Sequence, residues 1–197
     1  KQQLQQLNIP LIILNIPLWE DLAPEILNLC QTLNIENLHA NIEVGVNELK
    51  RDAQVQQLLE QQQIRVELYH DRTLFPLGSI RNQSNQPYQV YSAFKKKCYE
   101  RLILDVPACY PEIEAQDPIQ LPTGFINVDL EKFSADYVVE HAAQLWPADD
   151  QTALDLLDDF IEDKMAHYKT DRDLPAVDGT SRLSPYLNIG VISVRQC

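Results

Sequence analysis

The sequence lacks the usual marks of a membrane, metal or disulfide protein. No apolar run approaches the roughly 20 residues that a membrane helix needs, and the opening KQQLQQL does not resemble a signal peptide. Four cysteines stand at irregular spacing without a CxxC pair, which argues against a disulfide framework or a zinc site. The four histidines share no metal-ligand spacing, and no Ser-His-Asp or Cys-His arrangement stands out. We therefore expect a cytoplasmic protein with reduced thiols and no metal.

Basic residues are also scarce, with 16 Lys and Arg against 29 Asp and Glu and a net charge of −13. Such a balance argues against a nucleic-acid partner, because phosphate contacts require Lys and Arg. Much of the acid, however, lies within 129–163, where 149–163 is typical of a solvated helix face. Several basic residues lie outside that stretch: Lys95, Lys96, Lys97, Arg101, Arg172, Arg182 and Arg195. The charge pattern therefore leaves a nucleic-acid partner open.

The first part of the chain alternates between strand and helix patterns. Apolar or alternating runs predict strands over 11–16, 36–41 and 64–70, with the first one buried. Helical spacing predicts helices over 21–33 and 47–62. Strands separated by helices of this length pair in parallel with right-handed crossovers. We therefore predict an α/β fold with a Rossmann-like, doubly wound parallel sheet.

The second part is less regular. A loop is expected over 71–87, followed by a helix over 88–104 that covers the sheet with an apolar face formed by Tyr91, Phe94, Cys98 and Leu102. Prolines predict an extended connection over 107–124, and a helical pattern resumes around 149–167.

The most informative stretch is RDLPAVDGTSRLSPYLNIGVISVRQC at 172–197. Gly179 permits a tight bend, Thr180 and Ser181 supply hydroxyl groups, and Arg182 supplies a cationic fork suited to pyrophosphate. Ser184 is expected to cap a short helix that has Pro185 at its first position and ends at Gly190, and Ser193 to cap the next helix. A plain turn before a Ser-Pro helix start has the same appearance, so this chemistry alone favours a structural interpretation.

The amino-acid sequence of this stretch also resembles that of a known family. Tyr168, a run of eleven residues and then TSRLS resemble the start of the FAD site in the DNA photolyase and cryptochrome family. The form RDLPAVDGTSRLS with a final SVRQC is most similar to bacterial members that repair cyclobutane pyrimidine dimers. VGVNELKRDAQV at 44–55 and PYQVYSAFKKKCYERL at 87–102 also resemble the family, whereas about 105–165 matches only loosely.

The resemblance implies a domain order and a set of cofactor contacts. Residues 1–104 would form the antenna domain without its first strand, 105–148 an interdomain connection, and 149–197 the start of an all-helical FAD-binding domain. FAD would be contacted, mainly at its phosphates, by Tyr168, Thr180, Ser181, Arg182, Leu183 and Ser184. Tyr168 could instead be an ordinary core tyrosine at a helix end.

Two further sites follow from the resemblance, each with a structural alternative. Asn47 and Glu48 would bind an antenna folate, methenyltetrahydrofolate, because a carboxylate accepts paired hydrogen bonds from an aminopyrimidine edge. They could equally be a helix N-cap and a favourable first-turn acid. Arg172 would contact a DNA phosphate, or pair with a neighbouring aspartate.

The function implied for the intact protein is a light-driven lyase that acts as a monomer on damaged DNA. A pyrimidine dimer is flipped into a cavity against FAD, and excited reduced FAD donates an electron that splits the cyclobutane ring. The catalytic residues would lie outside these 197 residues, so we expect this chain alone to be inactive. A cryptochrome-like photoreceptor and a plain α/β nucleotide-binding module remain alternatives.

Overall fold

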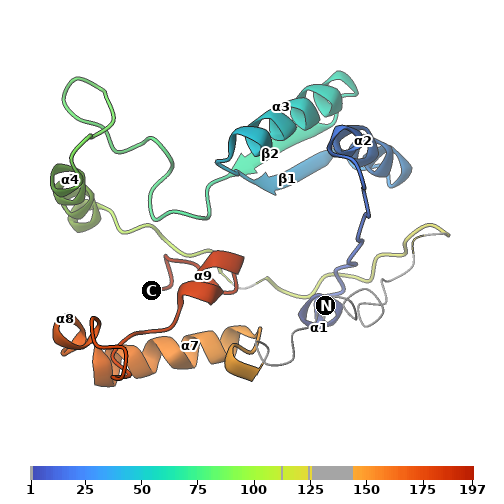
Figure 1. The fold of residues 1–197 in the computed structure, drawn as a ribbon. Helices are drawn as coiled ribbons and strands as arrows, with labels where there is room; N and C mark the ends of the chain where they lie inside the picture. The colour runs from blue at the N-terminus through green and yellow to red at the C-terminus, as the bar shows by residue number, and fades with distance from the viewer. Residues whose placement is uncertain (1, 112, 124, 126–143) are drawn as a thin grey trace. The chain divides into compact units, whose positions relative to one another are not determined.

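The computed structural model describes residues 2–111, 113–123, 125 and 144–197 (Figure 1). Contacts divide the chain into two compact units, each of which is described by itself. The first unit comprises Lys1–His70 and Tyr110–Asp136, and the second comprises Asp71–Cys109 and Tyr137–Cys197. The domain boundaries implied by the resemblance remain a prediction.

The first unit contains a β-α-β motif. Strands β1 (Asn37–Asn41) and β2 (Arg65–Tyr69) pair in parallel, with Leu38 opposite Val66, and helix α3 (Val46–Gln61) connects them (Figure 1). Parallel neighbours need such a crossover because the chain must return to the same end of the sheet. The strands predicted over 36–41 and 64–70, the intervening helix and the parallel pairing are confirmed.

Helices α2 (Leu22–Thr32) and α3 bury the apolar side chains of this unit. Leu38 and Val66 pack against the same cluster, so both helices cover one face of the strand pair. Burial raises the pKa of the Cys30 thiol, which keeps this thiol protonated and unreactive at neutral pH. The buried members of the cluster are Ala23, Cys30, Val55, Leu59 and Ile64.

The predicted strand over 11–16 is wrong. A short helix, α1 (Gln2–Gln6), is followed by irregular backbone over this run, and a single 3₁₀ turn, Trp19–Asp21, precedes α2. Within the described residues, the sheet consists of β1 and β2 alone. An apolar run becomes a strand only where a neighbouring strand satisfies its backbone groups, and Pro10 and Pro17 remove the donors at both ends of this run.

In the second unit, a loop leads to helix α4 (Tyr91–Leu104). The helix itself was predicted correctly, whereas its packing on the sheet stays a prediction because the sheet belongs to the other unit. The described part of the connection, 107–111 and 113–123, has no regular secondary structure, as expected for a proline-bearing segment. In the described part of the chain, every helix is too short or too polar to cross a membrane.

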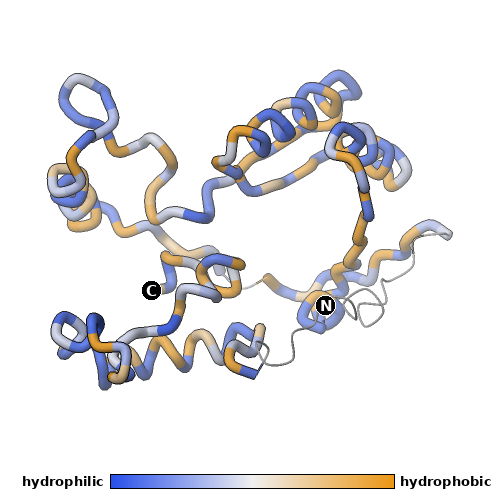
Figure 2. The backbone as a smooth tube through the Cα atoms, viewed as in Figure 1, coloured by the Kyte–Doolittle hydropathy of each residue, from blue (hydrophilic) through white to orange (hydrophobic). Residues whose placement is uncertain are grey.

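The helix predicted over 149–167 is a regular α-helix only in its first part. Helix α7 (Asp150–Asp159) runs into a single π turn, η2 (Phe160–Lys164), and a turn over 165–167 then leads to a separate short helix, α8 (Tyr168–Asp171). Along α7, Figure 2 shows hydrophobic and hydrophilic stretches in alternation. This alternation matches a helix that buries one face only.

Helix α9 (Ser184–Ile189) packs against α7 around a core of Ala153, Leu157, Leu183, Tyr186 and Ile192. The predicted N-cap at Ser184 is wrong, because Ser184 is the first helical residue and Leu183 precedes it without a side-chain cap. The predicted end is confirmed, since Gly190 has the left-handed φ of +75° typical of a helix stop. After α9, the Ser193 hydroxyl accepts the Arg195 N–H at 3.1 Å within a turn over 194–196, so the hydrogen bond is present but the helix that Ser193 was predicted to cap is not.

Candidate cofactor site

The candidate site is the turn between α8 and α9, residues 178–184. Gly179 is buried there, and a β-carbon added to it would collide with the β-carbon of Asp171, the last residue of α8. Glycine is therefore needed for a close approach between two backbones rather than for an unusual φ. As a result, the turn is pressed directly against the short helix that carries Tyr168.

The chain bends at Thr180, next to the predicted Gly179, whereas the left-handed residue of this turn is Arg182. Arg182 has a φ of +54°, in the left-handed region that costs a non-glycine residue about 1–2 kcal/mol. Such a conformation persists only where the surroundings determine it. The next residue, Leu183, is only 4% exposed in the core beneath the turn, so burial fixes the backbone on one side of Arg182.

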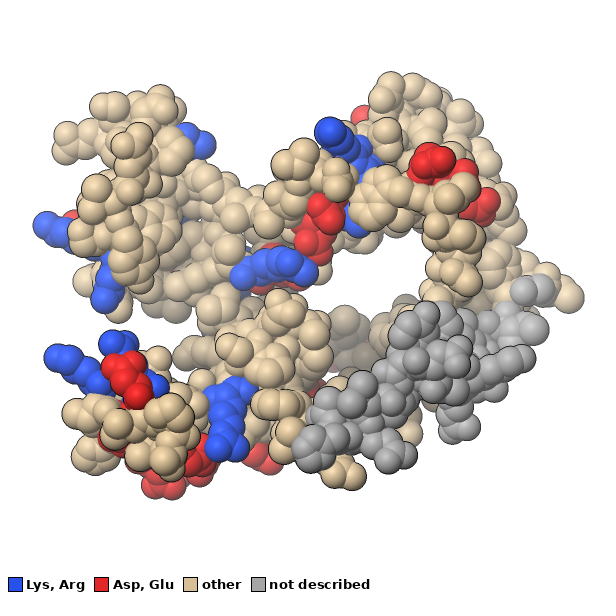
Figure 3. Space-filling view, viewed as in Figure 1, with Lys and Arg blue, Asp and Glu red and all other residues tan. Residues whose placement is uncertain are grey.

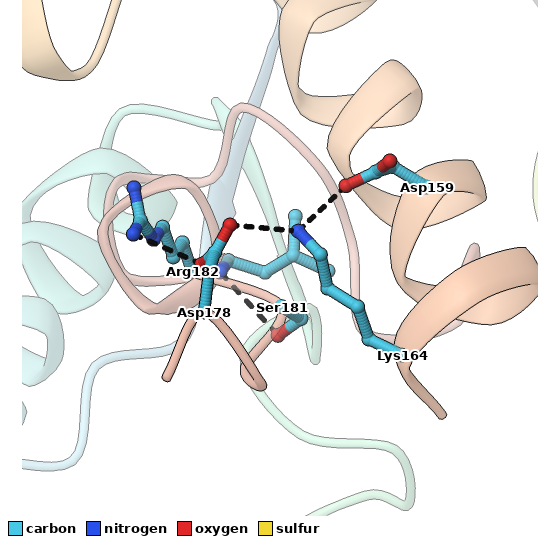
Figure 4. A network of polar contacts seen from close by, with 6 residues as sticks. Asp159, Lys164, Asp178, Ser181 and Arg182 are labelled. Carbon is cyan, nitrogen blue, oxygen red and sulfur yellow. Dashed lines mark hydrogen bonds and ion pairs between the residues drawn. The ribbon is translucent and has the colours of Figure 1, made fainter. Parts of the chain in front are cut away.

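A network of ion pairs fixes the Arg182 side chain (Figure 4). Arg182 Nη2 lies 2.9 Å from Asp178 Oδ1, and Lys164 Nζ lies 3.2 Å from Asp178 Oδ2. Lys164 also pairs with Asp159 at 2.6 Å. Lys164 and Arg182 together hold the pKa of the Asp178 carboxyl below its ordinary value. Figure 3 shows acidic and basic side chains interspersed over α7 and α8.

The hydroxyl residues predicted to contact FAD lie on either side of Arg182 in the chain. The Ser181 hydroxyl lies 3.5 Å from the Leu183 N–H, a long hydrogen bond that leaves most of the hydroxyl's capacity available. Thr180 and Ser184 are exposed. The turn therefore presents one guanidinium and three hydroxyl groups, a donor set that fits the oxygens of a phosphate.

Tyr168 is neither a core tyrosine nor fully exposed, since 39% of the residue is accessible. Its ring meets Phe160 edge-on at 5.6 Å, and the guanidinium of Arg172 lies 5.8 Å above it. Arg172 Nε also lies 3.7 Å from Asp173 Oδ2, the ion pair that the sequence offered as the alternative to a DNA contact. Exposed pairs of this kind contribute little to stability, so Arg172 could exchange partners readily.

Asn47 and Glu48 lie in the first turn of α3, which starts shortly after the end of β1. The suggestion that Asn47 caps this helix is wrong, because Gly45 is the N-cap residue and makes no side-chain cap. A β-carbon at Gly45 would collide with the Glu48 carboxylate, so the Glu48 side chain folds back over the glycine. Asn47 is exposed. Both residues lie at the carboxyl end of β1, where parallel sheets bind ligands.

Comparison with known proteins bears on the family to which the chain belongs. The model of the DNA photolyase family matches residues 1–112, more than half of the chain. The chain belongs to the DNA photolyase family. The resemblance read from the sequence is therefore confirmed at the level of the family.

Curated relatives extend the similarity beyond the α/β half. A deoxyribodipyrimidine photo-lyase of Vibrio cholerae is 33% identical over 100% of this chain and 41% of its own length. One from Buchnera aphidicola is 32% identical over 95% of this chain and 39% of its own length. The chain thus spans about two fifths of these relatives, 41% and 39% of their lengths.

Solved structures share the fold. A bacterial class III photolyase from Agrobacterium tumefaciens superposes with a TM-score of 0.57 at 23% identity, over 87% of this chain and 36% of that one. The cryptochrome of Synechocystis gives a TM-score of 0.59 at 20% identity, over 88% and 37%. Both likenesses support the incomplete Rossmann-like sheet of the photolyase fold.

Sequence reasoning missed Lys164 and Asp178. They are 14 residues apart, and the π turn that brings Lys164 into place has no sequence signature. Neither residue lies within 149–163, the stretch that was interpreted as a solvated helix face. The only signal in the sequence that pointed to Lys164 was its place, as a basic residue, shortly after an acidic helix.

Proposed function

We propose that the intact protein repairs cyclobutane pyrimidine dimers in DNA in a light-dependent reaction that uses FAD and an antenna chromophore. The observation that carries this proposal is the turn at 178–184, which holds an arginine in a strained backbone conformation beside exposed hydroxyl groups. The curated relatives named deoxyribodipyrimidine photo-lyase support it, since they align with 95% and 100% of this chain. Residues beyond this chain would supply the rest of the cavity.

In this proposal, the turn binds the phosphates of FAD, and the flavin supplies the light-driven electron. Arg182 provides the charge-assisted hydrogen bonds, and Thr180, Ser181 and Ser184 provide hydroxyl contacts. Leu183 fixes the position of the turn because its side chain is buried in the core between α7 and α9. Tyr168 donates its phenolic proton from α8, which Gly179 and Asp171 hold against the turn.

The antenna chromophore is proposed to be a folate, methenyltetrahydrofolate, bound by Asn47 and Glu48 at the carboxyl end of β1. The Glu48 carboxylate accepts hydrogen bonds from the aminopyrimidine edge, and the Asn47 amide adds a neutral contact. DNA is proposed to contact Arg172, whose side chain is half exposed and pairs with the exposed Asp173.

A repair assay on the full-length protein tests the proposal. The purified protein should contain flavin, and illumination should restore a DNA substrate that carries one pyrimidine dimer. Bound flavin without light-dependent repair would favour a cryptochrome-like photoreceptor. Absence of flavin from protein that refolds and is offered FAD would favour a plain α/β nucleotide-binding module.

A further inference from the structure

Asp178 joins two cations that arrive from different elements of the second unit. Its Oδ1 lies 2.9 Å from the guanidinium of Arg182, and its Oδ2 lies 3.2 Å from the ammonium of Lys164 (Figure 4). One carboxylate therefore contacts the arginine of the turn through one oxygen and the π turn η2 through the other.

The π turn explains how Lys164 reaches this position. In a regular α-helix, residues five apart point about 140° away from each other. Here the Met165 N–H bonds to the Phe160 carbonyl five residues earlier, at 2.7 Å, and the wider turn brings Lys164 back over Asp159. Asp159 ends α7, where a negative charge is unfavourable, so Lys164 also neutralises it.

Lys164 and Arg182 differ in what they can offer a ligand. The Lys164 side chain is 19% exposed, and two carboxylates occupy its ammonium group. The Arg182 side chain is 59% exposed, and in the described part of the chain Asp178 is its only ion-pair partner. A planar guanidinium has five N–H donors, so one edge can bind Asp178 while another faces an anion.

The charges of the network also cancel. Lys164 and Arg182 contribute two positive charges, and Asp159 and Asp178 contribute two negative ones. A network with no net charge attracts an anion weakly through its overall field. Its contribution to phosphate binding must therefore come from where it directs the Arg182 guanidinium.

We propose that Asp178 and Lys164 are positioning residues for the phosphate-binding turn: Lys164 holds Asp178, and Asp178 holds the guanidinium of Arg182 in the orientation that binds the FAD phosphates. This inference rests on the proposed function of the turn. It makes a prediction opposite to simple electrostatics, because removing a negative charge beside an anion site would otherwise strengthen anion binding.

The test is FAD affinity of the full-length protein with Asp178→Asn. We expect the dissociation constant to rise about three- to tenfold, the range for one hydrogen bond that orients a ligand-binding group. Asp178→Glu should restore most of the affinity because it keeps the carboxylate. Unchanged or tighter binding by Asp178→Asn would overturn the proposal, since only the charge effect would remain.

A double-mutant cycle separates positioning from general stability. In an Arg182→Ala background, Asp178→Asn should have no further effect on FAD affinity, whereas a structural role would add the same loss again. Lys164→Gln should weaken FAD binding less than Asp178→Asn and should also be silent in that background. If Arg182→Ala alone leaves FAD affinity unchanged, the turn is not the cofactor site, and the positioning proposal is then wrong as well. If Arg182→Ala weakens FAD binding but Asp178→Asn does not, only the positioning proposal is wrong.

Discussion

Gly179 lies so close to Asp171 that a methyl group on its α-carbon would overlap the Asp171 side chain. The added carbon would also approach the carbonyl carbon and the α-carbon of Asp171 to 3.3 and 3.4 Å. This contact joins the turn to the helix that carries Tyr168. Two segments that the family resemblance assigns to one cofactor are thus fixed to each other before any cofactor binds.

Gly179→Ala should therefore disturb both stability and cofactor binding. The added methyl meets backbone atoms that cannot yield cheaply, so the free energy of unfolding should fall by about 1–3 kcal/mol. FAD affinity should fall too, since the turn must move away from α8. Gly190→Ala is the matched control: it strains a left-handed residue with open space around it and should lower stability without changing FAD affinity. Denaturant unfolding and FAD titration check both variants, and equal FAD losses would contradict the prediction.

Two substitutions at Arg182 should separate binding from strain. Arg182→Ala and Arg182→Gly both remove the guanidinium and should weaken FAD binding about ten- to hundredfold, as expected for a charge-assisted hydrogen bond. Because Arg182 has a φ of +54°, the glycine variant should be more stable than the alanine variant by about 1 kcal/mol. FAD titration and thermal unfolding of the two variants measure these effects. Undiminished FAD binding by either variant would show that Arg182 is structural.

Glu48→Ala in the full-length protein should lower the content of antenna chromophore and leave flavin content unchanged. Gly45→Ala offers a second test, because its methyl would displace the Glu48 carboxylate that folds over Gly45. It should therefore lower antenna content as well, without removing a ligand-binding group. Chromophore extraction and absorption spectra give both contents. Full folate occupancy in Glu48→Ala, or an antenna that is a flavin, would contradict the assignment.

Asp149 should make the stability of the second unit depend on pH. Its carboxylate caps α7 by accepting the N–H and hydroxyl of Thr152, both at 2.7 Å, and these bonds lower the pKa of Asp149. A lowered folded-state pKa adds stability above the unfolded value of about 3.9, and this stability is lost as pH falls through the folded pKa. Asp149→Ala should lower the melting temperature at pH 7 and lose less stability than the wild type on acidification. Asp149→Asn keeps a capping side chain without the charge, so it should remove most of the pH dependence but not the stability that the cap provides. Identical acid profiles for all three proteins would rule this out.

The regular part of the first unit was predictable because its signals are local. The strands around Leu38 and Val66 and the helices on either side follow apolar periodicities, and the structure places them within one or two residues of the prediction. The strand over 11–16 failed because its pattern says only that the run is apolar. Whether such a run forms a strand depends on a partner elsewhere in the chain.

The candidate site was predictable as a set of residue types but not as a geometry. The sequence located a glycine and an arginine five and eight residues after Leu174, yet it did not show that Gly179 serves a close approach and that Arg182 takes the left-handed backbone. The pairing of Lys164 with Asp178 arises from tertiary contact after a π turn. No spacing rule contains that information.

These 197 residues, expressed alone, should associate and retain FAD poorly. The described residues include large apolar side chains that are almost fully accessible, among them Ile103 at 84% and Leu104 at 86%. Exposed apolar surface of this kind favours association, and a single turn of donors cannot enclose a cofactor. Light scattering and FAD titration of the purified polypeptide measure both properties. A monomer that binds FAD one-to-one, or that repairs DNA under light, would contradict this expectation.

The π turn between Phe160 and Lys164 holds one residue more than a regular helical turn needs. Deleting one residue between these two would let the helix close into a regular α-helical turn and would leave Lys164 four residues after Asp159, a spacing that places two side chains on one face of a helix. The five residues of the π turn cover about the same rotation as four α-helical residues, so the segment that carries Tyr168 would keep its orientation. Across related sequences, a deletion of one residue should accordingly be tolerated here more readily than one inside α7.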